Sequence, residues 1–182
     1  MRLEQRILQE YKKEKSDYHK RKIGIYHASE IYDICEGKIT PGGYFAEEKR
    51  TDMDIFNFWI GNMYHDAIQK MYPDAKKEIK IKIELADDVS IVGRCDMITE
   101  VPFELKTCSR FPVLPYDSHK YQFNCYLHGL KFDYGYITYI LKSSQEIKTE
   151  NYKVEYDKDL QVYINEKVLE FHKKLLLTNK EK

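Results

Sequence analysis

The sequence predicts an α/β protein in which helices flank a central mixed β-sheet. Segments with apolar residues at helical spacing are interspersed with segments in which polar and apolar residues alternate, as in half-buried strands. Helical segments, three strands, a helix, two strands and a final helix follow one another, an order typical of layered α/β folds. The 182 residues, 42% hydrophobic and 33% charged, fit one globular domain, 1–182.

The N-terminal part is expected to begin with two helices. The first, 1–22, carries a thin apolar stripe and more basic than acidic residues. It is either a solvated helix or a positive flank that helps to hold a phosphate backbone. In the second, short helix, Ser29 would cap the N-terminus, and Ile31, Ile34 and Cys35 would point inward.

A longer helix is expected after a loop at 38–45, which contains Pro41 and two glycines. This helix would begin at Asp54 and end before Pro73, because proline cannot continue it. Its apolar residues recur at helical spacing and are numerous, so we expect it to be largely buried.

Three successive strands are expected next. Residues 77–85 alternate strictly between polar and apolar, and a turn at Asp87 and Asp88 follows. Strands at 89–99 and 101–107 would complete an antiparallel meander.

The C-terminal part adds elements of both kinds. Pro112 and Pro115 break the chain in a loop, after which a helix would start at Asp117 or Ser118. The expected elements are a helix to residue 130, a hairpin edge formed by strands 132–141 and 147–156, and an amphipathic C-terminal helix, 157–176.

Charge, hydropathy and cysteine content indicate the kind of compartment in which the protein works. Its 30 basic and 30 acidic residues cancel, so any attraction to phosphate must come from local patches. The N-terminus lacks the apolar stretch of a secretion signal, and no segment approaches the about 18 apolar residues of a membrane span. Its four cysteines include no CxxC pair. We therefore expect a soluble cytoplasmic protein without disulfides.

Three charged residues on adjacent predicted strands form a candidate catalytic group. Asp96 lies late on its strand, and Glu104 and Lys106 project to one face of the next, because strand side chains alternate. Once these strands pair, Asp96 can approach Glu104, and two close carboxylates repel each other unless a cation binds. Oxygen ligands of this kind suit Mg²⁺ or Mn²⁺, and a nearby lysine can act on an attacking water or a phosphate.

Glu-x-Lys pairs are also common on exposed strands, where they have no chemical role. Here the alternating residues Phe103 and Leu105 are apolar, and Asp96 lies between Cys95 and Met97. Charged groups in such surroundings are usually paired or functional, which favours the functional interpretation.

Two predicted helices carry further candidates. Gly61 and His65 are one helical turn apart, so the glycine permits a close approach and the imidazole can serve as a neutral metal ligand. Gln122 and Tyr126 have the same spacing and can donate to phosphate oxygens or hold Lys106. Taken singly, each of these residues is more often structural.

Together these motifs run Gly-x3-His, Gly-x2-Asp, Glu-x-Lys and Gln-x3-Tyr, an order that resembles the PD-(D/E)xK nuclease superfamily. More narrowly, the chain resembles the RecB-like branch, which includes the CRISPR-associated exonucleases. The resemblance implies a restriction-endonuclease-like core, with residues 55–130 as the motif-bearing part. It also implies roles for particular residues: metal binding by His65, Asp96, Glu104 and the Leu105 carbonyl, action on the nucleophilic water by Lys106, and positioning by Gln122 and Tyr126.

The cysteines depart from the iron–sulfur members of that branch. Ser29-x5-Cys35 resembles the place of their first cluster cysteine, but those members carry three more near the C-terminus and this chain has none after Cys125. Four thiolates normally hold such a cluster. We therefore expect no iron–sulfur cluster and interpret Cys35 as a small buried hydrophobe.

The leading hypothesis is a Mg²⁺- or Mn²⁺-dependent deoxyribonuclease that acts on duplex ends or single-stranded DNA in repair, recombination or mobile-element processing. The chain is short and shows no specificity domain, and Tyr44, Phe45 and Tyr116 either stack on unpaired bases or anchor loops. The alternatives are a nucleic-acid-binding or assembly module without catalysis, and a structural protein with accidental motifs. A homo-oligomer stays open, and no membrane partner is expected.

Overall fold

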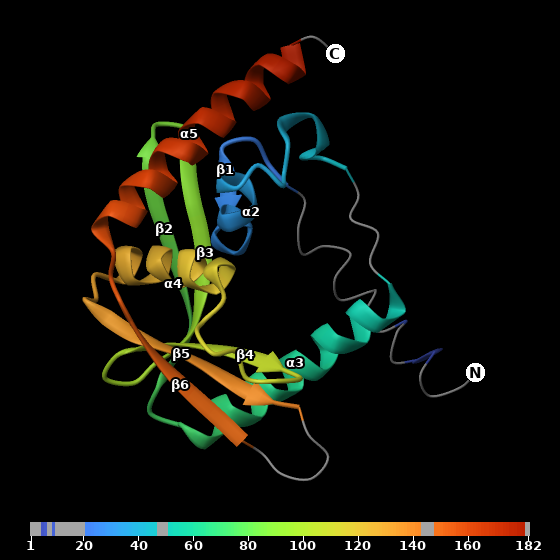
Figure 1. The fold of residues 1–182 in the computed structure, drawn as a ribbon, viewed down its shortest axis with the longest axis vertical. Coiled ribbons are helices and arrows are strands. Elements are labelled where there is room, and N and C mark those ends of the chain that lie inside the picture. The colour runs from blue at the N-terminus through green and yellow to red at the C-terminus, as the bar shows by residue number, and fades with distance from the viewer. Residues whose placement is uncertain (1–4, 7–8, 10–20, 47–50, 143–147, 181–182) are drawn as a thin grey trace.

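Figure 1 shows the computed structural model of the chain, which describes residues 5–6, 9, 21–46, 51–142 and 148–180. Most of the predicted N-terminal helix, 1–22, lies outside the described residues, and its last two residues, Arg21 and Lys22, are not helical. Within the described ranges, no helix is long and apolar enough to span a membrane.

A six-stranded mixed sheet forms the centre of the fold, as predicted (Figure 1). Its strands are β1 (Ile25–His27), β2 (Lys76–Ala86), β3 (Val89–Ile98), β4 (Pro102–Cys108), β5 (Tyr134–Leu141) and β6 (Lys148–Glu155). The order is β1-β3-β4-β5-β6, with β2 paired to β3. The β1–β3 and β4–β5 pairs are parallel, and the other pairs are antiparallel. The predicted meander of β2, β3 and β4 and the β5–β6 hairpin are therefore confirmed.

Strand β3 has two different neighbours along one edge. Strand β2 pairs with it along nearly its whole length on the other edge. On the edge opposite β2, strand β1 pairs with residues 90–92 of β3, and β4 pairs only with Met97 and Ile98. Residues 93–96 therefore lie where β1 and β4 diverge, and we call this place the fork.

Helices cover the sheet on the side where the core forms. The helical elements are η1 (Ala28–Glu30), α2 (Ile31–Cys35), η2 (Pro41–Gly43), α3 (Asp52–Met71), α4 (Asp117–Leu130) and α5 (Lys158–Lys180). Helices α2, α4 and α5 gather together against the sheet (Figure 1). They bury apolar side chains that include Phe123, Ile164 and Val168 against Ile91 and Ile137 of the strands. Removing this apolar surface from water is the main stabilising contribution to such a core.

The prediction that α3 is largely buried is wrong. Of its residues only Ile55 and Gln69 are buried, while Met53, Met63 and Met71 are more than half exposed. The helix lies apart from α2, α4 and α5 and approaches the sheet at β4 (Figure 1). When a helix packs against a sheet without helical neighbours, only one stripe of it is covered, so the apolar residues on its other sides stay in contact with solvent.

The beginnings of two helices also differ from the predictions. Helix α3 starts at Asp52 rather than Asp54, because Thr51 and Asp54 form a capping box in which each side chain accepts from the backbone of the other. Ser29 does not cap α2, since it lies within η1 and α2 has no side-chain cap. The inward residues of α2, including Ile31 and Cys35, are buried as predicted.

Candidate active site

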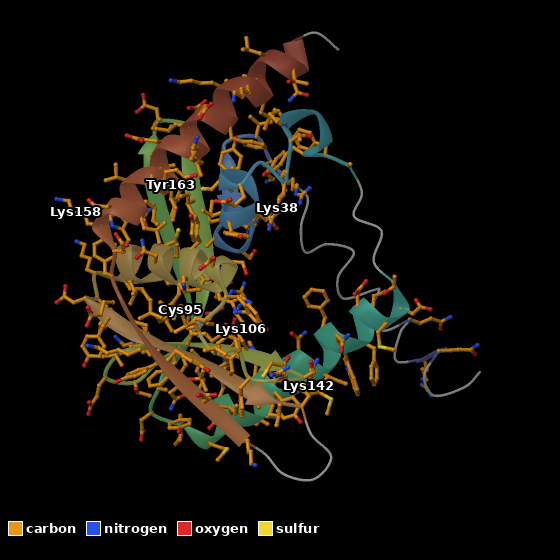
Figure 2. The ribbon with its side chains drawn as sticks, viewed as in Figure 1. Lys38, Cys95, Lys106, Lys142, Lys158 and Tyr163 are labelled. Atoms are coloured by element: carbon orange, nitrogen blue, oxygen red, sulfur yellow. The ribbon has the colours of Figure 1, made fainter. Side chains whose placement is uncertain are left out.

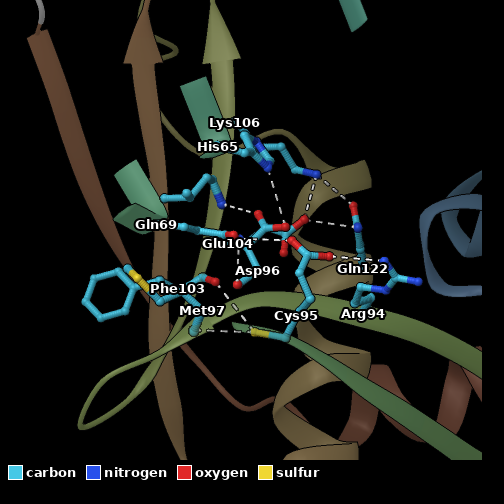
Figure 3. Close-up of polar contacts among 12 residues, drawn as sticks. His65, Gln69, Arg94, Cys95, Asp96, Met97, Phe103, Glu104, Lys106 and Gln122 are labelled. Carbon is cyan, nitrogen blue, oxygen red and sulfur yellow. Dashed lines mark hydrogen bonds and ion pairs between the residues drawn. The ribbon is translucent and has the colours of Figure 1, made fainter. Parts of the chain in front are cut away.

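The fork brings together charged residues from β3 and β4. The pairing of Met97 with Phe103 places Asp96 opposite Glu104, so their side chains share one face (Figure 3). Both are buried, with 8% of Asp96 and 2% of Glu104 exposed. Figure 2 shows Lys106 between α4 and α3, near the centre of the molecule. A carboxylate pair in such a place lowers the stability of the fold unless other groups compensate its charge.

Glu104 is the most confined acid of the group. Its Oε1 accepts hydrogen bonds from Lys106 Nζ at 2.8 Å and from Gln122 Nε2 at 3.1 Å. Its Oε2 is buried with no hydrogen-bond partner among the described residues. Burial and the nearby charge of Asp96 raise the pKa of Glu104 to about 7, although Lys106 acts in the opposite direction.

Lys106 is held in place by two acceptors. Its Nζ donates to Glu104 and also to Gln122 Oε1 at 3.1 Å. Burial lowers the pKa of Lys106, but the charges of Glu104 and Asp96 outweigh burial and raise it above its ordinary value. The lysine is therefore a cation in this arrangement, and it donates hydrogen bonds rather than accepting a proton.

Asp96 links the two strands to helix α3. Its Oδ2 accepts the backbone N–H of Leu105 at 2.7 Å, and its Oδ1 lies 3.6 Å from His65 Nδ1. Burial lowers the pKa of His65, but the hydrogen bond and charge of Asp96 and the charge of Glu104 raise it above its ordinary value. Gly61 faces β4, where an added Cβ would lie 3.5 Å from Thr107 Oγ1, so α3 passes close to this strand as predicted.

Gln69 is a site-supporting residue that sequence reasoning missed. Its Nε2 donates to the Asp96 carbonyl and to Glu78 Oε1, both at 2.9 Å, and so fastens α3 to β2 and β3. The signal was present in the sequence, because Gly61, His65 and Gln69 follow one another at intervals of four and share a helix face.

Helix α4 contributes the second wall of the site. Gln122 Nε2 donates to Tyr126 OH at 2.7 Å, one helical turn along. The ring of Tyr126 lies against Gly93, where an ideal Cβ would be 2.5 Å from a ring carbon. The absence of a side chain at residue 93 therefore permits the approach of α4 to the fork.

The donor set fits a divalent cation by its chemistry. Two carboxylates and one imidazole converge at the fork, and the unpartnered Oε2 of Glu104 is a buried acceptor that a cation would satisfy. Within the described ranges, however, no three His, Cys, Asp or Glu side chains are already arranged around one point. The ammonium of Lys106 lies against Glu104 and the imidazole of His65 against Asp96, so binding would require these side chains to adjust.

The three aromatic candidates have different surroundings. Tyr44 is fully buried against Tyr26 and Phe171, so it anchors its loop and is not available to stack on a base. Phe45 and Tyr116 are 49% and 52% exposed, which keeps both accessible. All four cysteines are buried thiols, Cys35 among them as predicted.

No family model and no curated protein matches the chain by sequence. Solved structures match its fold. The crystal structure of SSO0001 has a TM-score of 0.67 at 19% identity and covers 93% of this chain and 86% of its own. LHK-Exo in complex with dAMP has a TM-score of 0.61 at 12% identity and covers 85% of this chain and 89% of its own.

A phage-related exonuclease from Haemophilus somnus 129PT has a TM-score of 0.55 at 15% identity, with 85% of this chain and 83% of its own covered. LHK-Exo itself is described as an alkaline exonuclease from Laribacter hongkongensis. At these identities the likeness establishes the fold. The six-stranded mixed sheet with its flanking helices matches the folds of SSO0001, of LHK-Exo and of the phage-related exonuclease.

Proposed function

We propose that the protein is a divalent-metal-dependent deoxyribonuclease of the PD-(D/E)xK type that acts on DNA ends or single strands. The observation that carries this proposal is Glu104, a buried acid with one unpartnered oxygen, placed between Asp96 and Lys106. The shared fold with exonucleases supports it, and so does the dAMP bound by LHK-Exo.

A purely structural role accounts poorly for this group of charges. Buried ion pairs that only stabilise a fold need their remaining lone pairs satisfied, because the desolvation cost is otherwise not repaid. Glu104 Oε2 leaves that cost uncompensated, and Asp96 adds a second carboxylate opposite it. Retained charges of this kind are typical of sites where function sets the residue type.

In the proposed site, His65, Asp96 and Glu104 hold the cation, with the Leu105 carbonyl as a further candidate. A bound Mg²⁺ or Mn²⁺ would polarise the scissile phosphate and neutralise the charge that develops on its oxygens. The chain itself then supplies orientation, hydrogen-bond donors and exclusion of water at the fork.

Lys106 acts in this proposal as a fixed cationic donor. An ammonium has three N–H groups, and Glu104 and Gln122 accept two of them. The third is available to a phosphate oxygen or to the attacking water. Tyr126 holds Gln122, and Gln122 in turn holds Lys106, so the donor is aimed before the substrate arrives.

Degradation assays on defined DNA test the proposal. Linear and circular DNA, each single- and double-stranded, would be incubated with the protein and Mg²⁺, Mn²⁺ or EDTA. We expect metal-dependent degradation that is lost in Glu104→Gln and Lys106→Ala. Loss of linear but not circular DNA identifies an exonuclease.

Strand β6 provides matched controls, because Lys153 and Glu155 form the same kind of i,i+2 pair on the surface. The variants Lys153→Ala and Glu155→Gln should retain full activity. Degradation that survives Glu104→Gln and Lys106→Ala refutes the site, and DNA binding without degradation by the wild type identifies a binding module instead.

A further inference from the structure

A pocket of about 740 Å³ adjoins the candidate active site. Gln122 and Tyr126, which hold Lys106 in place, also line this pocket. Its other walls come from β2, from the middle of β3 and from the residues that follow β1. A ligand in this pocket would therefore lie next to a phosphate bound at the fork.

The strands supply positive charge to the pocket. Lys80, Lys82 and Arg94 line it together with a single carboxylate, that of Glu78. Lys80 pairs in register with Arg94, so these two side chains share one face of the sheet. Although the whole chain has no net charge, this pocket carries an excess of cations, which is the local patch that phosphate binding requires.

Arg94 is paired with Glu78 at 3.3 Å, but the two lysines are available to a ligand. Lys80 has no carboxylate partner in the part of the chain that the structure describes, and Lys82 contacts Glu84 in a pair whose side chains are both 60% exposed. Exposed pairs of this kind contribute little to stability, so a phosphate can displace the carboxylate.

Ser29 adds a neutral donor at the rim of the pocket. Its hydroxyl was expected to cap α2, but α2 has no side-chain cap and Ser29 makes no side-chain hydrogen bond within the described ranges. The side chain is exposed and lines the pocket instead. A serine hydroxyl here can donate to a phosphate oxygen without adding charge.

The remaining lining is apolar. It consists of Ala28, Ile81, Val92, Gly93 and the ring of Tyr126. Apolar surface beside a cationic rim suits a ligand with a phosphate on one side and a base and sugar on the other. The volume lies within the range of about 300–1,000 Å³ that is typical of small-molecule sites.

We propose that this pocket binds one nucleotide of the DNA strand next to the scissile phosphate. Its phosphate lies on Lys80, Lys82 and Ser29, and its base and sugar lie over Val92 and Tyr126. The inference rests on the proposed function, because only cleavage at the fork makes the pocket a substrate subsite. A nucleoside monophosphate should bind there without the rest of the strand.

Binding in EDTA tests the pocket without cleavage. The probe is a fluorescein-labelled single-stranded oligothymidylate of twelve residues, followed by fluorescence anisotropy. We expect the double variant Lys80→Ala/Lys82→Ala to bind about tenfold more weakly, with a shallower dependence of log Kd on log salt concentration. The matched control is Lys76→Ala/Lys77→Ala, which changes two exposed lysines of the same strand outside the pocket.

Competition identifies the part of the strand that is recognised. Thymidine 5′-monophosphate and thymidine 3′-monophosphate should displace the probe from the wild type and from the control, and thymidine should not. The monophosphates should lose this effect in Lys80→Ala/Lys82→Ala. Thermal melting of that variant should match the wild type, so that its loss of binding reports on the pocket. Unchanged probe affinity and unchanged competition in that variant overturn the proposal.

The two proposals fail in different ways. If Glu104→Gln abolishes degradation but Lys80→Ala/Lys82→Ala binds and cleaves like the wild type, the active site stands and the pocket is refuted. If the wild type degrades nothing but monophosphate binding depends on Lys80 and Lys82, the nuclease assignment and the subsite role are refuted, while nucleotide binding in the pocket stands.

Discussion

Strands β4 and β6 carry the same pair of residue types in different surroundings. Glu104 and Lys106 on β4, and Lys153 and Glu155 on β6, are both i,i+2 pairs with an N···O distance of 2.8 Å. The side chain of Glu104 is 3% exposed, whereas that of Glu155 is 75% exposed. Burial raises the pKa of Glu104 to about 7, but the hydrogen bond from Lys153 lowers the pKa of Glu155.

The two pairs therefore differ in the environment of their charges and not in their residue types. Water around Glu155 screens its charge and solvates its oxygen atoms, so the Lys153–Glu155 pair contributes little to stability. At the fork, protein atoms replace this water, and Glu104 keeps one oxygen without a hydrogen-bond partner among the described residues. Burying such a group lowers the stability of the fold, so stability alone does not account for its presence. Substitutions in the two pairs should therefore have different consequences.

The largest expected difference concerns activity. Glu104→Gln should lower the single-turnover rate of DNA degradation by about a thousandfold or more, because it removes a charged group from the proposed active site. Glu155→Gln should change that rate by less than about twofold, since its partner is solvated. The comparison breaks down if both variants retain the wild-type rate or if both lose it.

Lys106→Met should lower the stability of the metal-free protein. The substitution leaves the buried Glu104 and Asp96 without their cation, which costs about 3 kcal/mol in the free energy of unfolding. Lys153→Met should leave that free energy unchanged within error. Urea denaturation in EDTA measures both values, and Glu104→Gln/Lys106→Met should recover most of the loss. A double variant as unstable as Lys106→Met would show that packing rather than charge causes the effect.

His119 is another partly buried group whose environment shifts its pKa, and this shift makes the stability of the protein depend on pH. Burial and then the charge of Lys106 lower the pKa of His119 from 6.5 to about 3, and its Nδ1 shares a hydrogen bond with Tyr139 OH at 2.7 Å. Below pH 6.5, His119 binds a proton in the unfolded chain but stays neutral in the folded chain. The stability of the protein therefore falls as the pH falls toward about 3.

Between pH 6.5 and about pH 5 this linkage should cost the wild type about 1 to 2 kcal/mol. His119→Asn removes the titrating group, so the stability of this variant relative to the wild type should increase as the pH falls from 6.5 to about 5. Denaturation curves collected at several pH values provide the measurement. Parallel pH profiles for the two proteins would refute the assignment of this acid sensitivity to His119.

The smallest expected effects separate two buried tyrosine hydroxyls. Tyr126 OH accepts from Gln122 at the site, whereas Tyr26 OH shares a hydrogen bond with His172 Nδ1 at 2.8 Å in the core. Tyr126→Phe and Tyr26→Phe should each cost about 1 kcal/mol of stability, because one buried hydrogen bond is lost. Only Tyr126→Phe should also slow degradation, by about tenfold, since Gln122 positions Lys106. Equal rates for the two variants would remove Tyr126 from the site.

Much of the fold follows from local patterns. The alternation in residues 77–85 and the turn at Asp87 and Asp88 predicted β2 and the start of β3 to within a few residues. Helix α3 shows where such reasoning fails. Its apolar spacing predicted a helix, but the extent of burial depends on what packs around it, and the sheet covers one side of α3, mainly at β4. Apolar residues are therefore not sufficient evidence of a buried helix.

Strand periodicity was sufficient to predict that Glu104 and Lys106 share a face, because the period of two in a strand is a local property. Chemistry and strand spacing also predicted Asp96 and Glu104 as candidate ligands, whereas His65 and the Leu105 carbonyl were predicted mainly from the family resemblance. The tertiary structure alone decided that β1 and β4 diverge from one edge of β3, that α4 closes over Gly93, and that Glu104 is buried with one oxygen unpartnered. Those features arise from contacts between segments that are distant along the chain, where local periodicity carries no information and the packing of several elements sets the burial, and hence the pKa, of each group.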